Sequence, residues 1–90
     1  MDRIPLEPGR AVLSKAGRDA GRRFVVLWVD DTFAKVADGD LRKVETPKKK
    51  KHRHLRALPE KYDSIAGMLA EGKNPSNAEI RKCIADSDRP

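Results

Sequence analysis

Short apolar runs separated by turn residues fill the first half of the chain, a pattern typical of β-strands. Residues 10–15 (RAVLSK), 23–29 (RFVVLWV) and 33–37 (FAKVA) each predict a strand. The run 23–29 is apolar on both faces, so we expect this strand in the centre of the sheet and buried on both sides. Residues 30–32 predict a tight turn between the second and third strands.

Two further strands are expected before residue 60. Asp38 and Gly39 are typical of a hairpin turn, because such turns need positive φ angles and glycine adopts them readily. We expect residues 41–45 (LRKVE) to return from this turn, and Pro47 to end the pairing because proline has no N–H to donate. An open four-stranded sheet would leave exposed edges, so a fifth strand is expected at residues 54–58 (HLRAL), closing a small barrel.

Three aromatic side chains, Phe24, Trp28 and Phe33, lie in the predicted strands. A surface on which nucleic-acid bases stack would expose them. A small barrel needs large side chains to fill its interior, so we expect all three in the core.

One or two short helices should follow the strands, because apolar residues after residue 59 recur at the helical period. Gly72 is well placed to end the first helix. Ser76 and Glu79 form a capping box that begins the second. The apolar stripe of the second helix comprises Ile80, Cys83 and Ile84. This helix is too short to persist alone in water, so it must pack on the first helix, the barrel or a partner.

Positive charge is concentrated in one part of the chain. The 90 residues carry a net charge of +6, and residues 48–61, with seven Lys or Arg and one Glu, account for all of it. Residues 1–47 carry +1 and residues 62–90 carry −1, so they cancel. A concentrated field of this kind favours a polyanionic partner.

The single cysteine, Cys83, excludes an intrachain disulfide and a cysteine cluster for zinc, and suits a reducing compartment. The N-terminal residues carry charges and prolines where a signal peptide needs an apolar run. No apolar run approaches the roughly 20 residues that span a bilayer. We therefore expect a cytoplasmic protein without a membrane partner, organised as a flexible lead-in (1–8), a barrel (9–60) and a helical extension (61–90).

The loop at residues 15–23 (KAGRDAGRR) is the first candidate binding element. Its glycines allow a partner's backbone to approach closely, and its arginines and lysine can hold phosphate oxygens. The alternative is an ordinary hairpin loop with solvated charges. The candidate RNA-binding residues of this loop are Lys15, Arg18, Gly21, Arg22 and Arg23.

The second candidate is the basic stretch at residues 47–60 (PKKKKHRHLRALPE). It could be a folded basic surface, a solvated linker or a targeting signal. Leu55 and Leu58 follow the lysines directly, which favours a folded surface. With the basic residues just before it, the stretch gives a second set of candidate RNA-binding residues: Arg42, Lys43, Lys48, Lys49, Lys50, Lys51, His52, Arg53, His54 and Arg56.

His52 and His54 would point the same way on a strand. A metal site is not expected, because other ligands are missing and the neighbouring cations would repel a metal ion. Stacking on a base or contact with a phosphate is one interpretation of the pair, and plain surface exposure is the other.

Residues 9–39 resemble the KOW motif, in which a glycine-containing loop is followed by a basic residue and a hydrophobic strand. Gly21 matches the central glycine, with Arg22 and Arg23 after it. KOW domains are small SH3-like β-barrels found in ribosomal proteins and transcription elongation factors, and many bind RNA. The resemblance therefore implies a mainly β fold, a small SH3-like barrel followed by one or two short C-terminal α-helices.

The continuation VADGDLRKVETPKKKKHRHL and the closing NPSNAEIRKCI resemble a narrower group, the short bacterial KOW-domain RNA-binding proteins. These are relatives of the eukaryotic and archaeal type of large-subunit ribosomal protein. The resemblance covers about residues 8–86. Ala20 departs from it, because such proteins often have lysine or tyrosine before the glycine.

Two function classes follow from these observations. The first is an RNA-binding module that binds ribosomal RNA or associates with the ribosome. The second is a KOW-type protein–protein adaptor in the transcription or translation machinery, with the C-terminal helices as the docking element. We do not expect an enzyme, a cofactor or a small-molecule substrate, because no nucleophile has a base nearby and turn chemistry explains Asp38.

Overall fold

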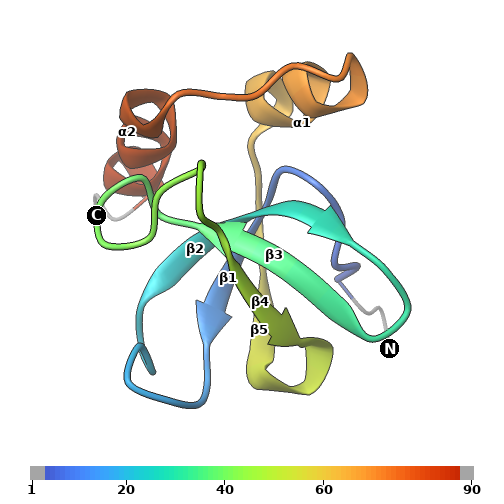
Figure 1. The fold of residues 1–90 in the computed structure, drawn as a ribbon, viewed down its shortest axis with the longest axis vertical. Helices are drawn as coiled ribbons and strands as arrows, with labels where there is room; N and C mark the ends of the chain where they lie inside the picture. The colour runs from blue at the N-terminus through green and yellow to red at the C-terminus, as the bar shows by residue number, and fades with distance from the viewer. Residues whose placement is uncertain (1–3, 88–90) are drawn as a thin grey trace.

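The computed structural model describes residues 4–87. Its five strands form one antiparallel sheet in the order β4-β3-β2-β1-β5, and two helices follow the sheet along the chain (Figure 1). The elements are β1 (Arg10–Ser14), β2 (Arg23–Val29), β3 (Phe33–Ala37), β4 (Lys48–Lys51), the 3₁₀ turn η1 (His52–His54), β5 (Leu55–Lys61), α1 (Asp63–Ala70) and α2 (Asn77–Ser87). The predicted mainly β fold with C-terminal helices is confirmed.

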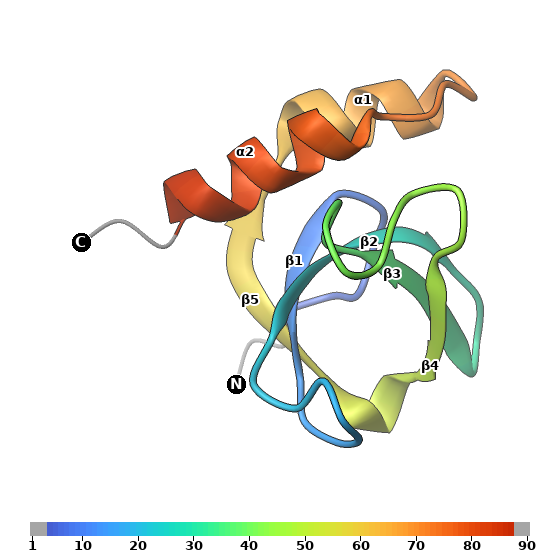
Figure 2. The ribbon, with the colours of Figure 1, turned by 60° about the vertical axis from the view of Figure 1, so that its left-hand side comes forward.

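Strand β2 lies in the middle of the sheet, and its residues Phe24, Val25 and Val26 are buried on the two faces, as the apolar pattern predicted. The sheet is strongly curved, and α1 and α2 lie along one outer side of it (Figure 2). On the concave face, Phe24 and Val26 of β2 join an inner cluster. On the face toward the helices, Val25 packs with Ile65 of α1 and Ile80 of α2. The other members of the inner cluster are Val12, Ala34, Val36 and Leu55.

A β-bulge in β2 overturns part of the predicted core. Val26 pairs with Val36, but the next paired residue is Trp28, which lies opposite Lys35. The extra residue, Leu27, reverses the alternation of the strand, because a bulge places two residues opposite one. Trp28 therefore points outward and is 42% exposed, whereas Phe24 is buried as predicted.

Phe33 also lies outside the inner cluster, although we expected it in the core. It is half-buried on the outward face of β3, where the neighbouring Ala34 takes the inward position. Its ring lies 4.5 Å from Nζ of Lys49. Of the three predicted core aromatics, only Phe24 fills the interior.

The predicted strand at residues 41–45 is wrong. Asp38 accepts hydrogen bonds from the backbone N–H of Asp40 (2.9 Å) and Arg42 (2.8 Å), so the chain turns back on itself there. Val44 donates its N–H to Asn77 Oδ1 (2.8 Å) on α2 instead of to a strand. These side chains satisfy the backbone groups that a sheet ladder would otherwise satisfy. The returning strand is β4, and Pro47, expected to end the pairing, precedes it.

The predicted helix boundaries are confirmed by their caps. Ser76 Oγ accepts the N–H of Glu79 (3.1 Å), and Glu79 Oε1 accepts the N–H of Ser76 (3.0 Å), which is the reciprocal capping box. At the end of α1, the N–H of Gly72 bonds to Leu69 O (3.0 Å) and the N–H of Lys73 to Met68 O (2.8 Å). Both helices pack on the sheet through the cluster of Val25, Ile65 and Ile80.

Helix α2 is also fixed to the loop at residues 38–47. Arg81 Nη1 donates to Gly39 O (2.6 Å), and Asn77 Nδ2 donates to the Glu45 carboxylate (2.8 and 2.9 Å). Gly39 has a φ of +77°, and a Cβ at this position would lie 2.3 Å from Asn77 O. Only glycine fits this contact. Because Asp38 does not have a positive φ, Asp38 and Gly39 do not form a type I′ turn, which needs positive φ at both central residues.

Of the predicted flexible lead-in, residues 1–3 lie outside the described residues. In residues 4–8, Leu6 packs against the inner cluster. Arg10 is buried and donates from Nε to Pro5 O (3.2 Å). Glu7 pairs with Lys61 at the end of β5 (2.6 Å). Neither helix in the described part of the chain has the length and apolar character needed to cross a membrane.

Candidate nucleic-acid interface

The glycine loop, residues 15–22, connects β1 to β2, and its base is closed by backbone hydrogen bonds. Gly21 N–H bonds to Ser14 O (2.8 Å), and Ser14 N–H bonds to Arg22 O (2.9 Å). Gly21 has a φ of +89° with open space around it, so glycine is needed here for its backbone angle and not for a close contact.

Lys50 of β4 reaches into the glycine loop and fixes its shape. Its Nζ donates to Ser14 Oγ (2.7 Å), Asp19 Oδ1 (2.7 Å) and Ala16 O (2.9 Å). The Ser14 hydroxyl in turn donates to Asp19 Oδ1 (2.7 Å). Lys50 is only 8% exposed, and all three ammonium hydrogens have acceptors. We predicted Lys50 as an RNA contact, but its geometry is that of a residue that positions the loop.

Asp19 is held in its charged form by this network. Burial alone would raise the pKa of its carboxyl, but the hydrogen bonds from Lys50 and Ser14 outweigh burial and lower the pKa below its ordinary value. The carboxylate is thus satisfied within the protein, and its charge is offset by Lys50. An anion approaching the loop meets little uncompensated negative charge from this residue.

Asp38 holds the loop at residues 38–47 in shape through hydrogen bonds. It is 6% exposed and accepts the two backbone N–H groups described above. Its second oxygen accepts a hydrogen bond from Nη2 of Arg22 (3.2 Å). Arg22 belongs to the glycine loop, so this ion pair joins the two loops directly.

A cleft of about 600 Å³ lies between the two loops and β4. Five cations and two carboxylates line it, and both carboxylates, those of Asp19 and Asp38, are already paired. The cations are Arg18, Arg22, Arg42, Lys48 and Lys50, and the remaining lining residues are Gly17, Phe24 and Leu41. We call the four cations other than Lys50 the cleft cations. All four are residues that the sequence predicted, and they come from three segments of the chain.

The four lysines of β4 divide into two sets because side chains alternate along a strand. Lys48 lies opposite Val36 and Lys50 opposite Ala34, two residues of the inner cluster. These lysines therefore share the inward side of β4. Lys49 lies opposite Lys35 and Lys51 opposite Phe33, on the outward side. The basic stretch therefore presents its β4 lysines on both sides of the strand.

A shallow hollow of about 350 Å³ lies between the glycine loop and β4. It is lined by Ala16 and Gly17 on one side and by Phe33 on the other, with His54 also contributing. All four β4 lysines border it. The hollow therefore connects the cleft to the outward face of the sheet.

His52 and His54 do not lie on a strand as predicted, because residues 52–54 form the 3₁₀ turn η1. His52 Nε2 lies 3.1 Å from Phe33 O, so its ring is directed at the backbone of β3. In residues 4–87, no three His, Cys, Asp or Glu side chains are grouped so that they could hold a metal ion.

The remaining predicted residues lie around these surfaces. Arg23 pairs with Glu60 (3.2 Å). Gly21 and Arg23 both line a second cleft, of about 450 Å³, that faces α2. Four others are exposed: Lys15, Lys43, Arg53 and Arg56. Neither the cleft nor the hollow includes these four in its lining.

Three further residues lie on the outward face: Trp28 and Phe33, which were expected in the core rather than on a stacking surface, and Lys35, which was not a sequence candidate. Nζ of Lys35 lies 5.2 Å from the Trp28 ring centroid. Alternation in FAKVA gave a usable signal, because it places Phe33 and Lys35 on the face opposite Ala34 and Val36. The bulge that exposes Trp28 left no comparable signal.

Comparison of the sequence with models of known protein families and with curated proteins finds no match. The functional interpretation therefore depends on the geometry of the described residues and on the motif resemblance.

Proposed function

We propose that this protein is a non-catalytic RNA-binding module, an SH3-like barrel of the KOW type, that binds ribosomal RNA or associates with the ribosome. The observation that carries the proposal is the arrangement of Arg18, Arg22, Arg42 and Lys48 around one cleft whose carboxylates are already paired. Arginine and lysine bind phosphate oxygens, and phosphate contacts supply most of the affinity of such interfaces. The KOW-like sequence of residues 9–39 supports RNA as the polyanion.

Arg18, Arg42 and Lys48 are available for ligand. Their side chains form no hydrogen bond or ion pair with other residues of the range 4–87. Lys50 holds the glycine loop and Arg22 holds the loop at 38–47, so the cleft is preorganised by two cations and presents three others. Preorganisation lowers the entropic cost of binding.

An adaptor that docks through its helices is supported less well. In residues 4–87 the exposed large hydrophobic side chains are Ile4, Trp28 and Leu41, and none of them lies in a helix. The apolar residues of α1 and α2 pack toward the sheet. Helices α1 and α2 therefore expose no large hydrophobic side chain on which a partner could dock, which suits a role in supporting the cleft.

The test measures binding of a fluorescently labelled ribosomal RNA hairpin by anisotropy at several salt concentrations. A variant carrying Arg18→Ser, Arg42→Ser and Lys48→Ser should lose about 100-fold in affinity at 0.1 M salt, and its log–log salt slope should fall by about 2. The matched control is Lys73→Ser with Lys82→Ser, two exposed lysines away from the cleft, which should bind as the unmodified protein does. Equal binding by both variants would reject the cleft.

The choice of RNA is tested by crosslinking in cells and sequencing of the attached RNA. Recovery of ribosomal RNA, reduced in the triple cleft variant, supports the proposal. Recovery of protein partners without RNA would favour the adaptor.

A further inference from the structure

We propose that the outward face of β2, β3 and β4 is a stacking surface for unpaired bases of a single-stranded RNA segment. The inference rests on the proposed RNA binding and specifies the form of RNA. We call this surface the aromatic face and define it as Trp28, Phe33, Lys35, Lys49 and Lys51.

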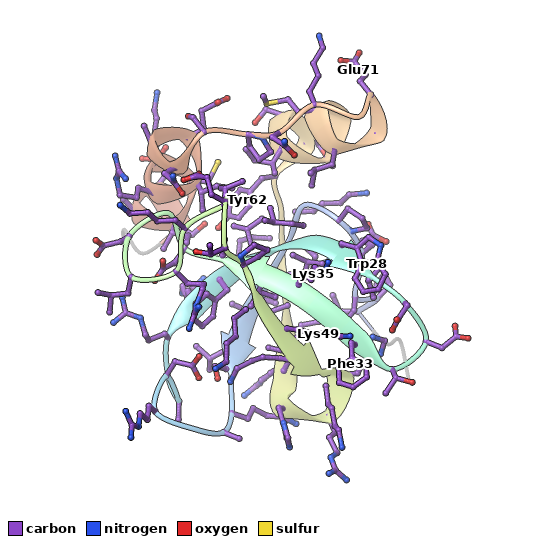
Figure 3. All side chains as sticks on the ribbon, viewed as in Figure 1. Trp28, Phe33, Lys35, Lys49, Tyr62 and Glu71 are labelled. Carbon is purple, nitrogen blue, oxygen red and sulfur yellow. The ribbon has the colours of Figure 1, made fainter. Side chains whose placement is uncertain are left out.

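The strand register places these five side chains together. Trp28 lies opposite Lys35, and Lys35 lies opposite Lys49, so the three form one row across three strands. Phe33 lies opposite Lys51 in the next outward row. Figure 3 shows Trp28, Lys35, Phe33 and Lys49 along one side of the sheet.

The two aromatic residues lie on neighbouring strands, close enough for one RNA strand to contact both. Phe33 is two residues from Lys35, the residue opposite Trp28, so the two aromatic residues are diagonal neighbours about 7–8 Å apart. Each ring has a lysine ammonium within reach, at 5.2 Å for Trp28 and 4.5 Å for Phe33. Aromatic side chains that alternate with cations are the arrangement that binds single-stranded nucleic acid, with bases on the rings and phosphates on the cations.

A base can displace the lysine that covers each ring. An exposed cation–π contact is weaker than the stacking of a base on an aromatic side chain. The displaced ammonium of Lys35 or Lys49 then remains close enough to pair with the adjoining phosphate. The lysines thus cover the rings in the free protein and bind the backbone in the complex.

The chemistry of the surroundings favours a polyanion over an apolar protein segment. Asp30, which lies opposite Phe33 in the β2–β3 turn, is the carboxylate nearest to the rings along these strands. Its Oδ1 is occupied by the N–H groups of Thr32 (2.9 Å) and Phe33 (2.6 Å). Asp31 follows it at the exposed tip of the turn. The hollow bordered by Phe33 and the β4 lysines leads from this face to the cleft, so one RNA strand can contact both.

Trp28 is the only tryptophan in the chain, so its fluorescence reports on this face alone. Titration with a 12-nucleotide oligouridylate should quench the emission, because a stacked base contacts the indole directly. A 12-base-pair RNA duplex and inorganic polyphosphate, which offer phosphates without unpaired bases, should bind with much less quenching. Equal quenching by polyphosphate would overturn the inference.

Variants separate this inference from the proposed function. Trp28→Leu and Phe33→Leu should each lower the affinity for labelled oligouridylate about tenfold while leaving duplex affinity unchanged. Trp28→Phe should restore most of the loss, and Lys82→Ser should change nothing. Thermal unfolding of each variant shows whether it is folded. The quenching test uses the unmodified protein, so it does not depend on the folding of any variant.

The outcomes are distinct. Binding of both RNAs without quenching, and without a loss in the leucine variants, overturns the stacking surface and leaves the cleft intact. Displacement of oligouridylate by oligoglutamate at equal charge concentration overturns it as well. Absence of binding to any RNA in the anisotropy measurement overturns the proposed function and this inference together.

Discussion

Lys49 and Lys50 are neighbours in the sequence with the same side chain, yet they belong to two different regions of the molecule. Lys50 is buried and bonded to Ser14, Ala16 and Asp19, so it belongs to the architecture of the cleft. Lys49 is exposed and lies over Phe33 on the aromatic face. The difference comes from strand alternation alone. A run of like charges on a strand therefore cannot be read as one binding surface.

Removing the buried lysine should have the largest effect. Lys50→Met leaves Asp19 and Ser14 without their cationic donor, and we expect the free energy of unfolding to fall by about 2–3 kcal/mol. Lys49→Met should change it by no more than about 0.5 kcal/mol. Urea unfolding of both variants measures the difference. Equal losses would mean that the two regions are not distinct in stability.

Acid should weaken the cleft, because the hydrogen-bond network around Asp19 depends on a charged carboxylate. The pKa of Asp19 in the folded protein lies below its ordinary value of about 3.9. A carboxyl with a lowered pKa stabilises the fold above the unfolded pKa, and this contribution disappears as the pH falls through the folded pKa. We therefore expect stability to drop below about pH 4.

Asp19→Asn should reduce the pH dependence of the free energy of unfolding, measured from pH 6 to pH 2. Hydrogen bonds from Lys61 lower the pKa of Glu7, and backbone N–H groups lower those of Asp30 and Glu79. These groups account for the dependence that remains. An unchanged profile in the variant would show that the Asp19 network does not contribute.

Two arginines of the cleft should differ in their effect on stability, because one supports the fold and the other only lines the cleft. Arg22→Gln breaks the ion pair with Asp38 and should cost about 1 kcal/mol of unfolding free energy, since Asp38 keeps its two backbone donors. Arg42→Gln removes a side chain that lines the cleft without such a pair and should leave stability within about 0.5 kcal/mol. Both should weaken RNA binding. Urea unfolding and anisotropy, measured on the same samples, test the two statements together.

The smallest expected effect is that of one exposed lysine. Lys49→Ser should weaken binding of labelled oligouridylate about fivefold at 0.1 M salt and reduce the log–log salt slope by about 0.7, the value for one phosphate contact. Lys82→Ser on α2 is the control. If both serine variants bind alike, Lys49 makes no phosphate contact.

Local sequence signals predicted the elements well where local interactions form them. The apolar runs gave β1, β2 and β3, and Ser76 with Glu79 marked the start of α2 because both partners of the capping box lie within four residues. The strand expected at residues 41–45 failed because Asn77 on a distant helix supplies the acceptor for Val44. No local pattern reveals a partner 33 residues away.

The basic residues of the candidate site were predicted from the sequence, but the roles of Lys50 and Arg22 in holding the two loops were not. Arg18, Arg22, Arg42 and Lys48 were named from the sequence, and folding places them around one cleft. The aromatic face escaped prediction because it depends on Leu27. One extra residue in β2 reverses the direction of Trp28, and only the pairing with β3 reveals it.

Gly39 gives the cleft a fixed wall. A Cβ there would lie 2.3 Å from Asn77 O, so the tip of the loop at 38–47 and the first turn of α2 meet without room for a methyl group. Any polymer that enters between the loops meets a boundary braced from behind by a helix. The ligand must therefore adapt its shape to the protein on this side of the cleft.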